Sequence, residues 1–270
     1  MAERVRAAVV QVLADDDAPR SIARAGELVQ AAAVAGAGVI VLPERWNWWG
    51  PADRRREGVE AIDGPALSAA RAWARELGVA IVAGSVLTAG GRDDRAHNTS
   101  VLIAPDGRDV ALYRKVHLFD VTVDGHAFRE SDFVEPGEAL AVGEAGGLRI
   151  GLSVCYDLRF PELYRGLVDA GATALAVPAY FTERTGEAHW EPLLRARAIE
   201  DQCFVLAAGQ CGRHGTPDAA WGHSMIVDPW GRVLAEVAAG EGFAAADLDL
   251  AEQRRIRASL PALRHRRLPA

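Results

Sequence analysis

The sequence contains little cysteine, with three residues in a chain of 270. Small secreted domains use cysteine in larger, even numbers to form disulfides, so an odd count of three indicates a reducing, cytoplasmic setting. A chain of this length buries about three quarters of its unfolded surface, and it therefore needs no disulfides to be stable.

Long apolar runs are also missing. The longest one, around Leu28–Leu42, is rich in alanine and glycine, carries Gln30, and is too short and too mildly apolar to span a bilayer. The first residues, MAERVRAAVVQV, place charges beside a short apolar strand, so we expect no signal peptide. These features predict a cytoplasmic protein with no membrane partner.

Positive charge is in deficit, since the formal net charge is −7. This balance argues against nucleic acid as the partner. The local basic run RHRR, Arg264–Arg267, is interpreted as a solvated tail or a subunit contact. Cys203, Cys211 and His214 do not have the spacing of a standard zinc site, and the glycine pairs lack the Lys-Ser/Thr of a phosphate loop. We therefore expect no metal and no cofactor.

Strand-like and helix-like segments alternate along the chain, and their order repeats in the second half. Local echoes support the repeat: VIVLPE is answered by ALAVPAY, and TSVLIAPDGR by HSMIVDPWGR. The strands predicted are Val5–Val12, Val39–Leu42, Val79–Val86, Thr99–Ala104, Val110–Arg114, Leu148–Val154, Ala174–Val177, Phe204–Ala208, Ser224–Val227 and Val233–Val237. The helices predicted are Ser21–Ala35, Pro65–Leu77, Pro161–Ala170 and Glu187–Gln202.

Two such β-α-β-α-β-β units predict an α/β fold with two mixed sheets. If the sheets pack face to face, the result is a four-layer α-β-β-α sandwich with pseudo-duplicated halves. Each sheet would be apolar on both faces, which fits the continuous apolar runs. No Ser/Gly-rich linker separates the halves, so residues 1–270 are expected to form a single domain. The segment Phe119–Leu140 matches no regular element and is interpreted as an active-site loop.

Three residues that could take part in catalysis lie at the ends of predicted strands. Glu44 follows VIVLP, Lys115 ends ALYRK, and Cys155 ends LRIGLSV. Sites in open α/β sheets collect beyond the carboxyl ends of the strands, so the fold could bring these residues together. Taken singly, each has an ordinary alternative, because the thiol could be structural and the carboxylate and ammonium could be solvated.

Together, the three side chains suit acyl transfer. The thiolate is the reactive form of cysteine, a carboxylate can accept the thiol proton, and an ammonium can lower the thiol pKa and later stabilise an oxyanion. The backbone N–H of Tyr156 could point at the same space, close to the positive end of a helix that begins at Pro161.

Three segments of the sequence, LPERW, YRKVHLFD and VCYDLRFPEL, resemble in order and position the signature segments of the nitrilase superfamily, the carbon–nitrogen hydrolases. The similarity covers nearly the whole chain, from Val5 to about Leu268. The stretches GEAHWEPLLRARAIEDQCFVLAAGQCGRH and WGHSMIVDPWG resemble the Nit branch, and within it the deaminated glutathione amidases more than the ω-amidases.

The resemblance implies a role for each matching residue. Cys155 resembles the family nucleophile, Glu44 the general base, and Lys115 the cation beside the tetrahedral intermediate. Glu130, in FRESDFVEPG, resembles the second glutamate of these sites.

The resemblance also suggests that Arg159 binds a substrate carboxylate, for which a guanidinium has suitable bidentate geometry. A structural ion pair with Asp157, Glu162 or another carboxylate is the alternative. Trp46, Trp48 and Trp49 either line the mouth of the pocket or pack in the core or a subunit contact.

By resemblance, the protein is expected to be a cysteine-dependent amidase. It would hydrolyse a primary amide of a small carboxylate-bearing substrate through a thioester acyl-enzyme and release ammonia, with deaminated glutathione as the best single substrate. The alternatives are an ω-amidase acting on α-ketoglutaramate or α-ketosuccinamate, a nitrilase, a thiol redox sensor, and a catalytically silent scaffold. A homodimer or higher homo-oligomer is expected on the same ground.

Overall fold

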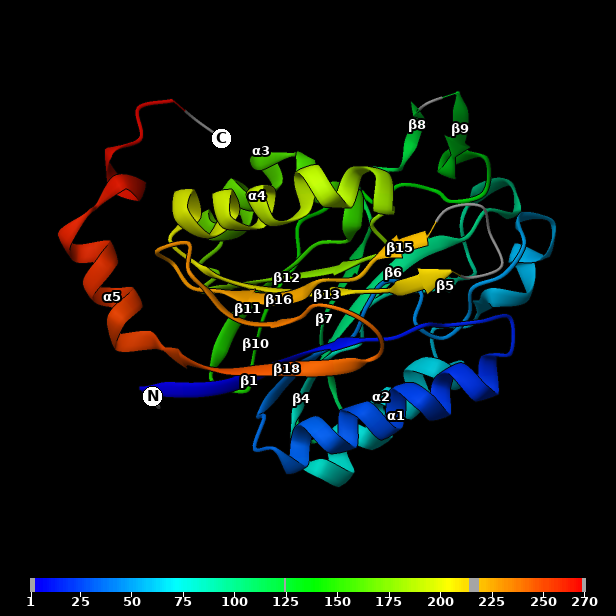
Figure 1. Ribbon diagram of the computed structural model, residues 1–270, viewed down its shortest axis with the longest axis horizontal. Helices are drawn as coiled ribbons and strands as arrows, with labels where there is room; N and C mark the ends of the chain where they lie inside the picture. The colour runs from blue at the N-terminus through cyan, green and yellow to red at the C-terminus, as the bar shows by residue number, and fades with distance from the viewer. Residues whose placement is uncertain (1–2, 124, 214–218, 269–270) are drawn as a thin grey trace.

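Two β-sheets lie face to face between two layers of helices (Figure 1). The computed structural model describes residues 3–123, 125–213 and 219–268. This order of layers is the four-layer α-β-β-α sandwich that the alternating segments predict, so the predicted fold class is confirmed.

The first sheet takes strands from both ends of the chain. Its strand order is β18-β1-β2-β4-β6-β5-β3, and β7 pairs with β6 outside this path. The strands are β1 (Arg4–Gln11), β2 (Val39–Val41), β3 (Val59–Glu60), β4 (Ala80–Val82), β5 (Val86–Thr88), β6 (His97–Ile103), β7 (Asp109–Arg114) and β18 (Gly242–Asp249).

The second sheet comes from the second half of the chain, in the order β10-β11-β12-β13-β16-β17. Two separate hairpins, β8–β9 and β14–β15, stand outside both sheets. The strands are β10 (Val142–Ala145), β11 (Leu148–Leu152), β12 (Ala174–Ala179), β13 (Phe204–Gly209), β16 (Ser224–Val227), β17 (Val233–Val237), β8 (Asp120–Val123), β9 (His126–Arg129), β14 (Cys211–Arg213) and β15 (Ala219–Trp221).

The alternation of side chains along each strand divides the core into two parts. On β1, Ala7 and Val9 point into the core between the sheets, whereas Ala8 and Val10 point into the core beneath the helices. Successive side chains of a strand face opposite sides, so a strand buried on both faces needs apolar residues at every position. This requirement explains the unbroken apolar runs of the sequence.

The helices cover the outer faces of the two sheets. In Figure 1, α1 (Ala18–Val34) and α2 (Pro65–Leu77) lie against the first sheet, and α3 (Pro161–Asp169) and α4 (Glu183–Asp201) lie against the second. Asp17 caps α1 by accepting the backbone N–H of Arg20, and Gly78 ends α2 with a φ of +66°. Within the described residues, no helix combines the length and the apolar character needed to cross a membrane.

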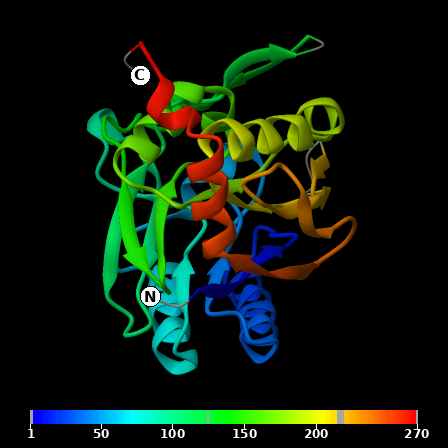
Figure 2. The same ribbon diagram turned by 90° about the vertical axis from the view of Figure 1, so that its left-hand side faces the viewer.

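A further helix, α5 (Leu250–Ser259), lies across one edge of the sandwich (Figure 2). Gln253 of α5 donates to the backbone carbonyls of Thr173 and Gln202, which precede β12 and β13. Short 3₁₀ helices occupy Ala52–Gly58, Arg92–Asp94, Glu130–Asp132, Cys155–Arg159 and Ala262–His265.

The strand predicted over Val79–Val86 is interrupted in the structure. Gly84 has a φ of +54°, and a Cβ atom at this position would lie 1.9 Å from the carbonyl oxygen of Pro43. Glycine is therefore required here, and its left-handed conformation ends β4 before β5 begins. The interruption lets Ser85 form an isolated bridge with Glu44.

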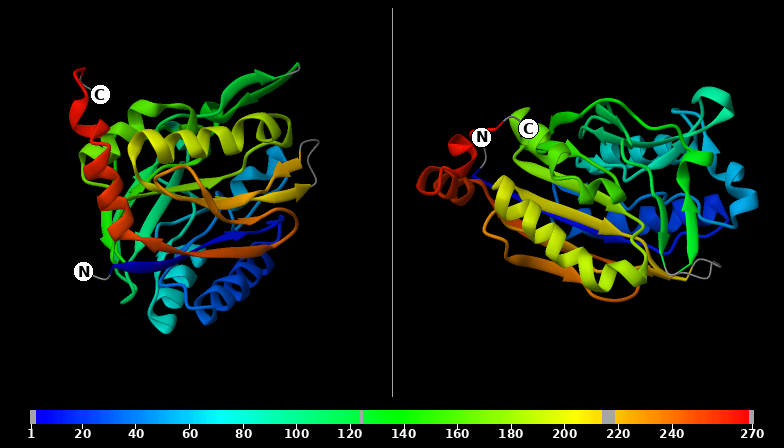
Figure 3. Two further views of the ribbon diagram at one scale, coloured as in Figure 1. Left: turned by 60° about the vertical axis from the view of Figure 1, so that its left-hand side comes forward. Right: turned by 90° about the horizontal axis from the view of Figure 1, so that it is seen from above.

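The prediction of no regular element over Phe119–Leu140 is wrong. The segment contains the hairpin β8–β9, which projects from the body of the molecule (Figure 3), and the short helix Glu130–Asp132. The strands are four residues each, which is too short for an alternation to be visible in a polar sequence. Residues of β9 and of the following helix line the cavity described below, so the segment does contribute to the site.

Candidate active site

Glu44 is held by backbone and side-chain contacts just beyond the carboxyl end of β2. Gln210 donates through Nε2 to the carbonyl oxygen of Glu44 at 3.0 Å. The Glu44 carboxylate accepts hydrogen bonds from Asn98 Nδ2 (2.8 Å), from the backbone N–H of Tyr180 (2.8 Å) and from Lys115 Nζ (3.2 Å). The side chain is 5 % exposed, so its position is set by these donors rather than by solvent.

Lys115 lies immediately after β7 and links two carboxylates. Its Nζ donates to both oxygens of Glu130, at 3.1 and 2.8 Å, and to Glu44 at 3.2 Å. Burial by itself lowers the pKa of this ammonium, but the charges of Glu130 and Glu44 outweigh burial and raise the pKa well above its usual value. The ammonium therefore stays charged at neutral pH. Glu130 is held in turn by the N–H of Phe119 at 2.7 Å.

Cys155 lies at a sharp turn between β11 and α3. Its φ of +51° is left-handed, a conformation that costs a residue with a side chain about 1 to 3 kcal/mol. Asp157 stabilises the turn by accepting the N–H of Val154 at 2.8 Å and the hydroxyl of Tyr113 at 2.8 Å. Asp157 also accepts from the backbone and the ring of His117. Asp157 thus connects the turn to Val154, which follows β11, and to Tyr113 and His117, which flank Lys115.

The Cys155 thiol is protonated at rest. Its Sγ donates to the carbonyl oxygen of Tyr180 at 3.3 Å. Burial, reinforced by the charge of Glu44, raises the pKa of the thiol well above its usual value, while Lys115 acts in the opposite direction. The lowering effect of the ammonium, expected from the sequence, is therefore present but does not prevail. A base must take the thiol proton during reaction.

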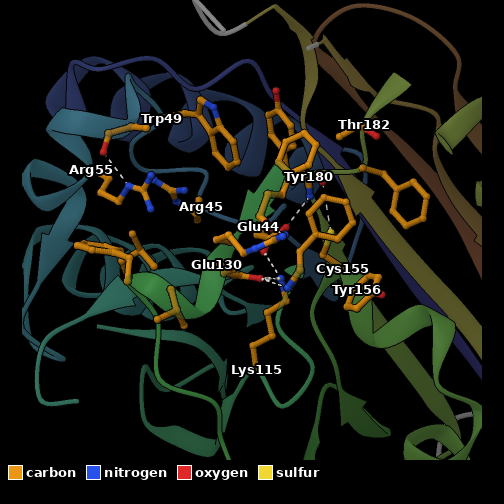
Figure 4. A pocket seen from close by; sticks show the side chains of 18 of the residues that line it. Glu44, Arg45, Trp49, Arg55, Lys115, Glu130, Cys155, Tyr156, Tyr180 and Thr182 are labelled. Carbon is orange, nitrogen blue, oxygen red and sulfur yellow. Dashed lines mark hydrogen bonds and ion pairs between the residues drawn. The ribbon is translucent and has the colours of Figure 1, made fainter. Parts of the chain in front are cut away.

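A cavity of about 400 Å³ opens onto these groups (Figure 4). This volume suits a small organic ligand. Among the described residues, the walls carry five cationic side chains and two carboxylates, a formal excess of three positive charges in a chain whose net charge is −7. The cations are Arg45, Arg55, Lys115, Arg129 and Arg159, and the carboxylates are Glu44 and Glu130.

Comparison with known proteins agrees with this geometry. The model of the family described as carbon-nitrogen hydrolase matches residues 6–258. A deaminated glutathione amidase from Bos taurus is 42% identical over an alignment of 268 residues, gaps included, that covers 96% of this chain and 81% of that protein. The chain belongs to the carbon–nitrogen hydrolase family. It is a member of the nitrilase superfamily, and its relatives support an amidase that hydrolyses carbon–nitrogen bonds other than peptide bonds.

Solved structures of carbon–nitrogen hydrolases share the fold. Saccharomyces cerevisiae Nit3, a member of branch 10 of the nitrilase superfamily, has a TM-score of 0.89 and 28% identity, covering 99% of this chain and 98% of that chain. A variant of the amidase from Nesterenkonia sp. AN1 has a TM-score of 0.80 and 26% identity, covering 97% of this chain and 94% of that one. That structure shows covalent addition of the acetamide moiety of fluoroacetamide at the active site cysteine.

In this carbon–nitrogen hydrolase, Tyr156 and Arg159 both line the cavity. Among the described residues, Arg159 has no ion pair with Asp157, Glu162 or another carboxylate, and Asp157 is occupied by its contacts with Val154, Tyr113 and His117. The guanidinium lies 5.1 Å from the ring centroid of Phe181, and its Nη1 is 3.2 Å from His189 Nδ1. The structural ion pair that was the alternative to substrate binding by Arg159 is therefore absent from the described part of the chain.

The three tryptophans separate into two groups. Trp46 and Trp48 are 0 % and 2 % exposed and pack in the interior, whereas Trp49 lines the cavity. The Trp49 ring stacks on Tyr180 at 3.7 Å between centroids. Among the described residues, no group of three or more His, Cys, Asp or Glu side chains could hold a metal; His214, part of the zinc set considered above, lies outside those residues.

Sequence reasoning missed Asn98, Tyr180 and Arg45. Asn98 is a buried amide in the polar first half of β6, whose sequence is HNTSVLI, and a buried polar group needs a partner. Tyr180 and Arg45 occupy the same place in the two halves, one in ALAVPAY and the other in VIVLPER, so the internal repeat could have linked them. Their contacts with the site depend on how the two sheets pack.

Proposed function

We propose that this hydrolase cleaves an amide of a small carboxylate-bearing molecule through a thioester on Cys155, with deaminated glutathione as the leading substrate. The meeting of Glu44, Lys115 and Cys155 at a positively charged cavity carries the proposal. The names of the curated relatives favour this substrate. The covalent adduct on the cysteine of the Nesterenkonia amidase supports the use of a thiol nucleophile.

In the first half-reaction, Glu44 takes the thiol proton as the Cys155 sulfur attacks the amide carbonyl. A carbon–sulfur bond forms, and the carbonyl electrons move onto oxygen. The oxyanion is stabilised by the Lys115 ammonium and the backbone N–H of Tyr156. Glu44 then gives its proton to the amide nitrogen, the carbon–nitrogen bond breaks, and the amine leaves.

In the second half-reaction, water replaces the amine. Glu44 takes a proton from water, which attacks the thioester carbonyl, and the carbon–sulfur bond breaks to release the carboxylic acid. The sulfur regains a proton from Glu44. Glu130 holds the ammonium of Lys115 through two hydrogen bonds, which keeps the cation in place during both steps.

The cavity charge favours an anionic substrate, and the leaving group separates the candidates. Deaminated glutathione has no primary amide, because its amide nitrogens are those of its cysteinyl and glycyl residues. Its cleavage would release an amine, whereas α-ketoglutaramate and α-ketosuccinamate would release ammonia. The primary amide expected from the sequence therefore fits the ω-amidase alternative better than the leading substrate.

The test is turnover of deaminated glutathione, both keto-acid amides and a matched nitrile by the purified protein. We expect the highest kcat/KM with deaminated glutathione, with cysteinylglycine as the released amine. Intact-mass analysis should show an acyl adduct that disappears in a Cys155→Ala variant. Preference for the keto-acid amides would favour the ω-amidase, and a thiol that never acquires an acyl group would favour a silent scaffold.

A further inference from the structure

One wall of the cavity carries two arginines with no carboxylate partner in the described part of the chain. Arg45 Nε is buried and has no hydrogen-bond partner. Arg55 donates through Nε to the carbonyl oxygen of Ala52 at 2.7 Å. Arginines such as Arg20, Arg54 and Arg71 pair with carboxylates nearer the surface. Among the described residues, Arg45 and Arg55 lack an ion pair, as do Arg129 and Arg159, which line the same cavity.

Arg45 is held against aromatic rings by its backbone conformation. Its φ of +50° is left-handed, and its N–H donates to the carbonyl oxygen of Ser85 at 2.7 Å. The guanidinium lies 4.3 Å from the ring centroid of Trp49 and 5.8 Å from that of Trp48. A planar cation stacked on aromatic rings keeps its edges available for a bidentate acceptor.

The positive charge of Arg45 and Arg55 on this wall favours the binding of an anion. Burial lowers the pKa of Arg45 to about 10, and the charge of Arg55 acts in the same direction, while Glu44 and Glu130 oppose both. Arg45 is still charged at neutral pH. A carboxylate between the two guanidinium groups would relieve their repulsion through charge-assisted hydrogen bonds.

The position of this wall relative to Glu44 decides which part of a substrate reaches it. In Figure 4, Trp49, Arg45 and Arg55 lie on one side of Glu44, and Cys155 and Tyr156 lie on the other. In the proposed mechanism Glu44 protonates the departing nitrogen, so the amine must extend past Glu44, away from the thiol. The wall that it meets there is the one formed by Trp49, Arg45 and Arg55.

We propose that Arg45 and Arg55 form an anion subsite for a carboxylate on the leaving amine, so that the preferred substrate is a secondary amide of a carboxylate-bearing amine. The inference rests on the proposed amidase function and adds to it the residues that bind the carboxylate of the leaving amine. Arg159, which is four residues beyond Cys155 and beside Phe181, is left to the acyl part of the substrate.

The test uses three γ-amides of α-ketoglutarate that share one acyl group and differ in the amine: glycine, glycinamide and ammonia. Wild-type protein is expected to prefer the glycine amide over the glycinamide amide by about 10- to 100-fold in kcat/KM, the value of a charge-assisted hydrogen bond. Arg45→Gln and Arg55→Gln should each reduce this ratio about tenfold. Arg56→Gln is the matched control, because Arg56 is exposed, pairs with Asp94 and does not line the cavity.

The outcomes separate the subsite from the function. A wild-type protein that cleaves all three amides equally well overturns the subsite and leaves the amidase in place, as does an unchanged ratio in both arginine variants. An equal loss on all three amides in those variants would assign the arginines a structural role and also overturn it. Absence of turnover with every amide would count against the proposed function itself. Calorimetric binding of the intact glycine amide to Cys155→Ala, with and without Arg45→Gln, measures the subsite independently of turnover, and equal affinities would contradict it.

Discussion

Cys155 and Cys203 are two buried thiols with similar immediate surroundings. They are 7 % and 0 % exposed. Cys155 donates to the carbonyl oxygen of Tyr180 at 3.3 Å, and Cys203 to that of Ala172 at 3.4 Å. Burial raises the pKa of both, that of Cys203 to about 12. Burial and a carbonyl acceptor therefore do not distinguish a reactive thiol from a structural one.

A neighbouring cation does not distinguish them either. Arg257 Nη2 lies 3.0 Å from the Cys203 sulfur, and the charge of Lys115 acts on Cys155. The differences are that Cys155 has the carboxylate of Glu44 beside it, lines a cavity, and has a left-handed backbone that turns it out of the strand. A proton acceptor and an open face, rather than a nearby positive charge, set the candidate nucleophile apart.

The largest expected effect comes from replacing each of the two thiols in turn. Cys155→Ala should lower amide turnover by about 10⁴-fold or more, because it removes the group that forms the thioester. Cys203→Ala should keep turnover near wild type and lose stability through the cavity that it leaves in the core. Steady-state rates and urea unfolding of both variants provide the check. Equal losses of activity would mean that Cys155 is not special.

The second prediction removes the proton acceptor and keeps its shape. Glu44→Gln should lower kcat/KM by about 10²- to 10⁴-fold, since the amide cannot take the thiol proton or deliver one to the leaving nitrogen. Arg257→Gln, which removes the cation beside Cys203, is the control and should not affect the rate constants. Wild-type activity in Glu44→Gln would mean that another group acts as the base.

The third prediction concerns pH. Because the pKa of Cys155 is raised by burial, the thiol is protonated between pH 7 and 9, and its thiolate fraction rises about tenfold per pH unit. In Glu44→Gln the charge of Glu44 no longer raises the pKa of the thiol, but burial still does, so alkylation of Cys155 by iodoacetamide should rise across this range without a plateau. In the wild type the dependence should be flatter, since Glu44 removes the proton. Cys203 should stay unlabelled in the folded protein at every pH. Peptide mass mapping at several pH values measures all three, and a plateau below pH 8 in the variant would contradict the raised pKa.

The smallest effect is expected from the turn that holds Cys155. Asp157→Asn should lower kcat about tenfold, because it weakens the hydrogen bonds that keep Val154 and Cys155 in place. It should also cost about 1 to 3 kcal/mol of unfolding free energy, since the Tyr113 hydroxyl loses a charged acceptor. Thr173→Ala is the control, because Thr173 follows Ala172, whose carbonyl oxygen accepts from Cys203. This variant should change stability without changing kcat. Wild-type kcat in Asp157→Asn would show that the turn needs no carboxylate.

Much of the fold could be predicted from the sequence because strands buried on both faces leave continuous apolar runs. The candidate site was partly predictable for a similar reason: Glu44, Lys115 and Cys155 each follow a strand that the runs reveal. Contacts made by tertiary packing were not predictable. Gly84 ends a strand because the Pro43 carbonyl lies against it, and no local pattern encodes that approach.

The parts of the site that were missed depend on segments with weak local signals. Glu130 was identified by resemblance, yet the hairpin that precedes it was not predicted. Tyr180 and Arg45 face the cavity only because the two sheets stack. Strand β18 is also missing from the predicted strands. Its sequence is GFAAADLD, in which four of the eight residues are Ala or Gly, and its partner β1 lies at the other end of the chain.

The pairing of β1 with β18 has a consequence for synthesis of the protein on the ribosome. Arg4 pairs with Asp249 and Gln11 with Gly242, so one edge of β1 has no partner until nearly the whole chain has been translated. During that time the nascent chain presents an unpaired, apolar strand edge, which is the kind of surface through which chains associate incorrectly. The last strand to emerge therefore protects the first one, and a ribosome that stalls before residue 242 would release a chain prone to aggregation.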